Sequence, residues 1–269
     1  MTILPFTYLA VFSATLAGAA YIVTKRPAVL KASTYLAAAA VVVELAWLMQ
    51  AGMKFHYCVL LDPWGVAGVL TMALIIGGVA ANLRYDSPRI MVGTLALASL
   101  LLSLGYFIFP APGRASMPMH WLLAFHIFIV SLGISVLGVG FVIGVLILLR
   151  SRLLKSDWWG TGDGARWPSL TTLDRMFVKT LGWGIAIMTA GIILGIAYSS
   201  EASLKAPWYD DLKVILTFAS IILYSVVLVL RRRQGFCTMP VVGLSTLGFA
   251  FIFIGLLISG LFNIGFHKF

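Results

Sequence analysis

Eight apolar runs follow one another along this chain of 269 residues, and each is long enough to cross a membrane as a helix. A helix that spans a hydrocarbon core of about 30 Å needs about 20 apolar residues. A closed barrel would need alternating apolar and polar residues, which the runs lack. The sequence therefore predicts an all-α, polytopic bundle of about eight transmembrane helices, at residues 3–23, 32–51, 65–83, 90–109, 121–149, 176–199, 211–230 and 240–262.

The composition excludes an ordinary soluble protein. Hydrophobic residues make up 61% of the chain and charged residues 10%, whereas soluble domains average about 45–50% and about 25%. Only the hydrophilic segment 150–175 is long. We therefore expect residues 1–269 to form a single transmembrane domain, in which 1–110 supplies four N-terminal helices.

The basic residues predict the orientation in the membrane. Of the 19 Lys and Arg residues, 14 follow or flank the ends of the odd-numbered spans, and positively charged loops remain in the cytoplasm. We therefore expect both termini outside a bacterial inner (cytoplasmic) membrane, with lipid as the surrounding partner. The net charge of +10 is explained by this orientation and does not indicate nucleic acid binding. On this topology Cys58 and Cys237 face opposite sides, so they cannot pair with each other.

All four histidines fall on the predicted outer side. His56 precedes the third span, His120 and His126 begin the fifth, and His267 follows the eighth. Imidazole is an axial ligand of haem iron and also binds zinc, copper and nickel. Each histidine alone is compatible with an interfacial or helix-end residue, whereas a pair from the fifth and eighth spans is compatible with a haem site.

The segment APWYDDLK, residues 206–213, concentrates polar and aromatic residues between two apolar runs. Trp208 suits the outer membrane interface, and Asp211 lies where the N-terminal dipole of a helix favours negative charge. Lys213 is a cation just inside the next span, where it either snorkels to the surface or pairs with an acid.

Glu44 is the acid that lies well inside an apolar run, AAAAVVVELAWLMQ. Burying a carboxylate without a partner is costly, so such a residue is a functional candidate. Two alternatives remain open, a neutral or hydrogen-bonded packing residue and a residue that binds a proton or cation.

Three local patterns predict structure rather than chemistry. Asp62 is expected to cap the third span or begin a turn with Pro63. Ser169 and the threonines that follow it are candidate caps of the sixth span, with Asp174 near the helix start. The small residues in GVGFVIGV and MTAGIILGIAY allow close packing of helices.

Two stretches together resemble the cytochrome c assembly family of the CcsA/ResC type, with its HemX-like relatives. The first is HWLLAFHIFIVSLGISVLGVGFVIGVLILLRSRLL, in which a tryptophan precedes a histidine and a long span. The second is the tail, where APWYDDLK is followed by a span, a basic loop and a last span that ends GLFNIGFHKF. The resemblance makes 115–269 a cytochrome c assembly-like region.

This resemblance implies haem b handling at the outer face, in cytochrome c maturation, haem transport or haem delivery. It implies that His126 and His267 are axial ligands of the haem iron, with Trp208, Asp211 and Lys213 against the porphyrin. It further implies a CcsB/ResB-like membrane partner and apocytochrome c as partners, without assigning a stand-alone enzyme activity.

Several departures keep alternatives open. The second Trp of the family motif is Asp210 here, its Pro is Leu212, and no histidine lies near the inner end of the seventh span. The spacing from Trp to His in the fifth span also leaves His120 as an alternative ligand. The chain therefore resembles a divergent, HemX-like member. The alternatives are an electron-transfer subunit with permanent haem and a regulatory or transport protein without haem.

Overall fold

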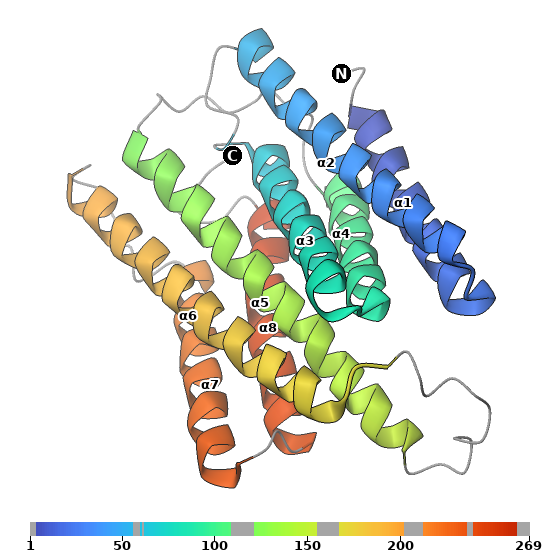
Figure 1. The fold of residues 1–269 in the computed structure, drawn as a ribbon. Coiled ribbons are helices and arrows are strands. Elements are labelled where there is room, and N and C mark those ends of the chain that lie inside the picture. Colours follow the sequence, from blue (N-terminus) through green and yellow to red (C-terminus); the bar gives the residue numbers. More distant parts are fainter. Residues whose placement is uncertain are drawn as a thin grey trace.

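The computed structural model describes residues 4–55, 60, 62–108, 121–154, 167–201, 212–235 and 239–262. Within these ranges it contains eight helices (Figure 1). Their bounds are α1 Leu4–Thr24, α2 Pro27–Phe55, α3 Pro63–Tyr85, α4 Pro88–Ile108, α5 Trp121–Leu153, α6 Leu170–Glu201, α7 Leu212–Gln234 and α8 Met239–Phe262.

Each of these helices is long and apolar enough to cross a membrane. The prediction of an all-α, multi-pass membrane protein is therefore confirmed. Helices α2 and α6 begin earlier than their apolar runs, at Pro27 and Leu170. A proline is favoured at the first position of a helix because its missing N–H needs no partner there. At α6 the Ser169 hydroxyl accepts a hydrogen bond from the Thr172 amide at 3.0 Å, so the predicted cap extends the helix into polar sequence.

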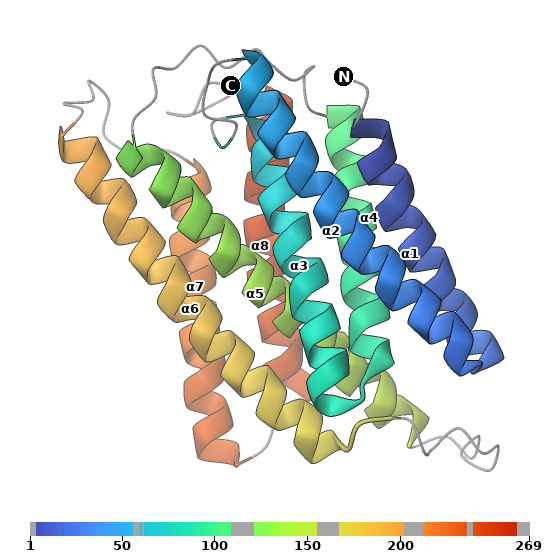
Figure 2. The same cartoon turned by 45° about the horizontal axis from the view of Figure 1, so that its top comes forward.

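Consecutive helices run in alternating directions, and α5 lies at the centre of the bundle (Figures 1 and 2). It packs against α3, α4, α6 and α8. The α1–α2 hairpin lies at one edge, where α1 contacts α4 and α2 contacts α3. At the other edge α7 packs mainly against α8.

Two hairpins are closed by tight turns that require left-handed backbone. Lys25 has a φ of 56° between α1 and α2, and Asp86 has a φ of 45° between α3 and α4. A residue in this conformation commonly ends a helix and reverses the chain. These turns bring each pair of helices into antiparallel contact.

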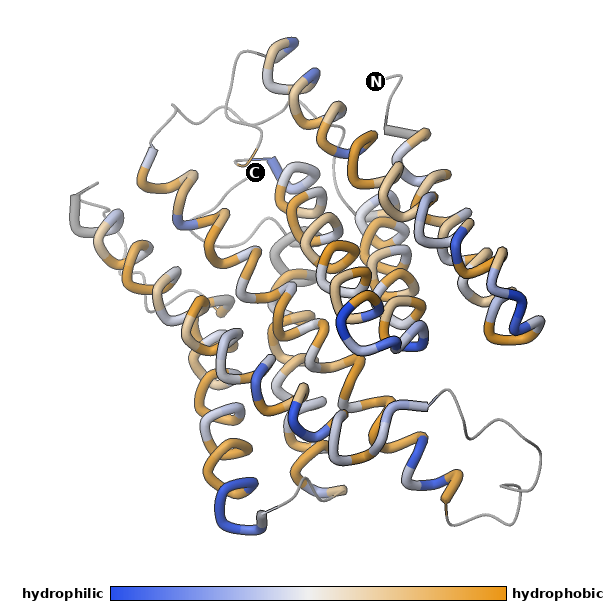
Figure 3. Tube along the Cα trace, in the orientation of Figure 1, coloured by the Kyte–Doolittle hydropathy of each residue, from blue (hydrophilic) through white to orange (hydrophobic). Residues whose placement is uncertain are grey.

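Hydrophilic residues gather at one end of the bundle, where the odd-numbered helices end (Figure 3). We call this the basic end and the opposite one the far end. The basic end holds Lys25, Arg26, Lys31, Arg84, Arg89, Arg150, Arg152, Arg175, Lys179, Arg231, Arg232 and Arg233. This is the end that the sequence predicts to be cytoplasmic.

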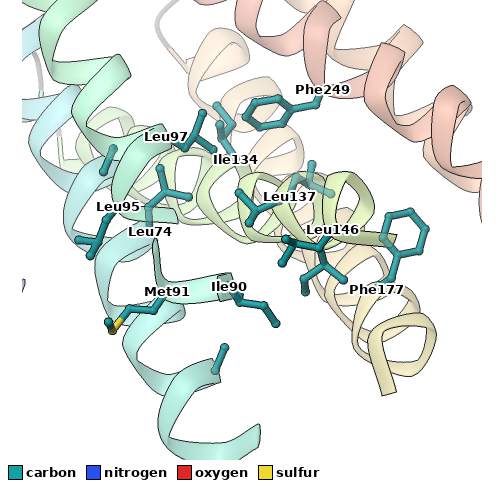
Figure 4. Packing of buried hydrophobic residues seen from close by; sticks show 14 of the residues in the cluster. Leu74, Ile90, Met91, Leu95, Leu97, Ile134, Leu137, Leu146, Phe177 and Phe249 are labelled. Atoms are coloured by element: carbon teal, nitrogen blue, oxygen red, sulfur yellow. The ribbon is translucent and has the colours of Figure 1, made fainter. Parts of the chain in front are cut away.

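The core is formed where α3, α4, α5 and α8 meet. Leu74, Leu97 and Leu137 interdigitate there, as Figure 4 shows, and each is buried. The rings of Phe141 and Phe249 stack with centroids 4.8 Å apart, which joins α5 to α8.

Glycines let α5 and α6 approach closely, both inside the predicted stretch MTAGIILGIAY and outside it. Inside it, a Cβ atom at Gly191 would stand 3.2 Å from the backbone nitrogen of Val130. Gly133 and Gly184 lie outside the two predicted stretches. A Cβ atom at Gly133 would stand 3.0 Å from the backbone nitrogen of Met188. One at Gly184 would stand 2.5 Å from Leu137 Cδ2. Because no side chain fits at these positions, the two helices pack almost backbone to backbone, as small residues commonly permit in membranes.

Candidate functional site

His126 lies near the beginning of α5, at the far end of the bundle. It is the sixth residue of the helix, which places it roughly 8 Å along the axis at 1.5 Å per residue. Its side chain is partly buried, and it faces α6, where the imidazole Nδ1 lies 2.7 Å from the Gly191 carbonyl oxygen. The helix-to-helix contact therefore fixes the imidazole.

Gly195, one turn further along α6, lies against the ring. A Cβ atom there would stand 2.6 Å from His126 Cε1 and 2.9 Å from Nδ1. Real Cβ contacts are never so short, so an alanine at this position would displace the imidazole. The Gly191 carbonyl oxygen is thus the hydrogen-bond acceptor for His126, and Gly195 leaves room for its ring. We call these two residues the glycine cradle.

The hydrogen bond to Gly191 assigns the imidazole tautomer. A carbonyl oxygen only accepts, so Nδ1 carries the proton and donates. Nε2 is then the nitrogen with the lone pair, which is the form that binds a metal. Histidines that ligate metals usually donate their other ring N–H to a carbonyl or carboxylate in this manner. The His126 arrangement therefore fits an axial ligand of haem iron.

Exposed aromatic side chains follow α5 on either side of His126. Trp121 is 69% exposed, Phe125 48% and Phe128 37%. Their spacing of four and three residues puts them in one stripe of the helix. This stripe gives the far end of α5 an exposed aromatic surface. At 3.6 residues per turn it lies on a different face of the helix from His126, which points to α6.

Five of the six residues predicted for the haem site cannot be compared with the structure. Four of them lie outside the described residues, namely His120, Trp208, Asp211 and His267. Lys213 is the second residue of α7, but its side chain is not among the described ones. The structure therefore describes one predicted ligand, His126. It adds Gly191 and Gly195, which the sequence indicated only as small residues in MTAGIILGIAY.

The sequence pattern of the family described as Cytochrome C assembly protein matches residues 64–267, which run from α3 to beyond α8. This chain belongs to the cytochrome c assembly protein family. The match contains His126 and its glycine cradle and extends to His267, and it begins well before the region 115–269 that the motifs indicate. Helices α1 and α2 precede the match.

A curated relative is Protein HemX of Bacillus subtilis (strain 168). The two sequences are 31% identical over 110 residues, which are 41% of this chain and 39% of HemX. The alignment thus spans well under half the length of each protein. It is consistent with the resemblance to HemX-like relatives that the sequence motifs indicate.

Glu44 of helix α2 contacts helix α3. Helix α2 precedes the residues that match the family, and α3 is the first helix within them. The Glu44 side chain is 1% exposed. The Thr71 hydroxyl of α3 donates a hydrogen bond to Glu44 Oε1 at 2.6 Å. The second oxygen, Oε2, is buried without a hydrogen-bond partner among the described residues. This contact agrees with the hydrogen-bonded packing alternative and leaves one oxygen unused.

Polar contacts at the basic end join other helices of the family region. Arg231 Nη2 of α7 lies 2.7 Å from Asp174 Oδ2 of α6. Asp174 was expected only to favour the start of α6, and the structure adds this ion pair. The guanidinium of Arg89 lies 4.1 Å from the ring centroid of Trp167, which fixes the segment before α6 to α4. At the far end of the bundle, Asp62 caps α3 as expected, where its carboxylate accepts a hydrogen bond from the Trp64 amide at 2.9 Å.

Proposed function

We propose that this member of the cytochrome c assembly family binds haem b at the far end of the bundle, as cargo for cytochrome c maturation or haem delivery. The observation that supports this most is the contact of His126 Nδ1 with the Gly191 carbonyl oxygen at 2.7 Å. It holds the imidazole in the tautomer that a haem iron accepts as a ligand. Family membership supports the role in maturation.

The remaining ligands follow the family resemblance. His267 is the proposed second axial ligand, with His120 as the alternative to His126. Trp208 would stack near the porphyrin, and Asp211 and Lys213 would position the propionates or their own loop. A lysine beside a propionate is a favourable charge pair.

The proposed site is at the outer face of the membrane. The basic end carries most of the described cations, so the positive-inside rule puts the far end outside a bacterial cytoplasmic membrane. Attachment to apocytochrome c at that face would involve a partner of the CcsB/ResB type, because the described part of this chain is almost entirely membrane helix.

Glu44 supports a second candidate function, a regulatory or transport protein of the HemX type without haem. Its carboxyl group is buried, and Oε2 has no hydrogen-bond partner within the described helices. Intramembrane carboxylates commonly serve proton or substrate coupling. On this alternative, replacing Glu44 abolishes activity and replacing His126 has no effect on it.

The absorption spectrum of the detergent-purified protein tests the proposal. We expect a reduced bis-histidine haem spectrum in the wild-type protein, weakened by His126→Ala and by His267→Ala. Wild-type protein that binds no haem, even when haem is supplied, would contradict the proposal and favour the haem-free alternative. If both variants still bind haem, other residues ligate the iron, and His120 and His56 are the next to replace.

A further inference from the structure

A second candidate site lies at the other end of the bundle, in a groove between α3, α5 and α6. The groove has a volume of about 620 Å³, which is within the range of about 300–1,000 Å³ usual for small-molecule sites. It lies where the basic ends of α3 and α6 converge on α5 (Figure 2). Neither His126 nor Glu44 contributes to it.

The walls of the groove are apolar and its inner part is formed by small side chains. Gly77 and Ala80 of α3 form one wall, Val139 and Ile143 of α5 the floor, and Met176 of α6 the other wall. A Cβ atom at Gly77 would stand 3.0 Å from Val139 Cγ2, so α3 and α5 are in close contact at this depth. Such a surface accepts a hydrocarbon chain.

Two cations lie at the rim of the groove. Arg84 of α3 and Lys179 of α6 both line it, together with the exposed ring of Tyr85 and the hydroxyl group of Thr180. Over the helices and turns that the structure describes, no ion pair is found for either cation. No acidic side chain lines the groove. The rim therefore carries two positive charges that are available to an anionic group.

We propose that the groove binds an anionic phospholipid of the cytoplasmic leaflet, with its acyl chain on Gly77 and Ala80 and its phosphate between Arg84 and Lys179. Gly77 and Arg84 are seven residues apart on α3, which is roughly 10 Å. The groove thus runs from the headgroup level into the acyl region. The positive-inside rule assigns this end to the leaflet that is rich in anionic lipids, and basic pockets between transmembrane helices bind such headgroups.

Native mass spectrometry of the purified full-length protein tests the site, with phosphatidylglycerol and phosphatidylcholine as the added lipids. We expect phosphatidylglycerol to be retained selectively, and Arg84→Ala and Lys179→Ala each to lower its retention about fivefold. Ala80→Trp fills the groove and should lower it as well. Arg232→Ala is the matched control, because it removes an exposed cation of α7 at the same end and should change nothing.

Equal retention of the two lipids by the wild-type protein would overturn the proposal. So would an Arg232→Ala variant that loses as much phosphatidylglycerol as Arg84→Ala, because the charge effect would then be general. Retention of a long-chain carboxylate in preference to phosphatidylglycerol would assign the groove to another amphiphile. A thermal unfolding curve for each variant separates lost lipid from lost fold.

Discussion

Gly195 of α6 lies against the imidazole of His126 on α5, and a Cβ atom at Gly195 would stand 2.6 Å from His126 Cε1. The absence of one methyl group therefore allows the imidazole to reach the Gly191 carbonyl oxygen. This relationship connects helix packing to the proposed haem ligand, because a change on α6 alters a side chain on α5.

Gly195→Ala should weaken haem binding about tenfold, since the imidazole must leave its rotamer to make room. Gly182→Ala is the matched control on the same helix, because a Cβ atom there meets nothing within 4 Å. Haem titration of the purified variants measures the difference. Equal affinities for the two variants would show that the contact does not position the ligand.

Thr71→Val should destabilise the protein by about 1 kcal/mol, because it leaves the buried Glu44 carboxyl without its hydrogen-bond donor. Glu44→Gln should cost less, since an amide oxygen still accepts from Thr71. Thermal unfolding in detergent measures both. Thr246→Val is the control, because that hydroxyl bonds only within α8 in the described structure, to the Val242 carbonyl. If Thr246→Val loses as much stability as Thr71→Val, the assigned role of the contact between Thr71 and Glu44 is contradicted.

Arg231→Ala should destabilise the attachment of α7 to α6 by about 1–2 kcal/mol. The substitution leaves the Asp174 carboxylate, 7% exposed, without the guanidinium that now lies 2.7 Å away. The neighbouring Arg232→Ala should have little effect, because that side chain is exposed and surface charges contribute little. If the unfolding curves of Arg231→Ala and Arg232→Ala coincide, the ion pair does not stabilise the contact between α6 and α7.

The two cysteines test the predicted orientation. Cys58 lies between α2 and α3, and Cys237 between α7 and α8. A membrane-impermeant maleimide added to intact cells should label the Cys237→Ser variant, which keeps Cys58, and not the Cys58→Ser variant. Permeabilised cells provide the control in which both are labelled. The reverse pattern in intact cells would place the basic end outside.

The sequence predicts the helices well because membrane insertion depends on local hydrophobicity. All eight apolar runs coincide with helices. The apolar run of the sixth span begins at 176, whereas the helix begins at Leu170, directly after the predicted cap Ser169, and continues through polar residues around Arg175. Hydropathy locates the membrane core and not the ends of the hydrogen-bonded helix.

Contacts between helices are less predictable, because they depend on how each helix is rotated about its axis. The sequence identifies His126 and Glu44 as candidates from their residue types. It does not identify Gly191 or Thr71 as their partners, since these lie on other helices at no fixed spacing. The glycines of α6 predict close packing in general, and the structure shows which of them faces the imidazole.

Imidazole rescue of His126→Gly tests the central claim most directly. The account predicts that purified His126→Gly loses the wild-type haem spectrum and that added imidazole restores it by entering the space left by the side chain. Gly182→Ala, carried through the same titration, should show the wild-type spectrum and no response. A His126→Gly protein with an unchanged haem spectrum before imidazole is added would contradict the assignment of His126 as the ligand.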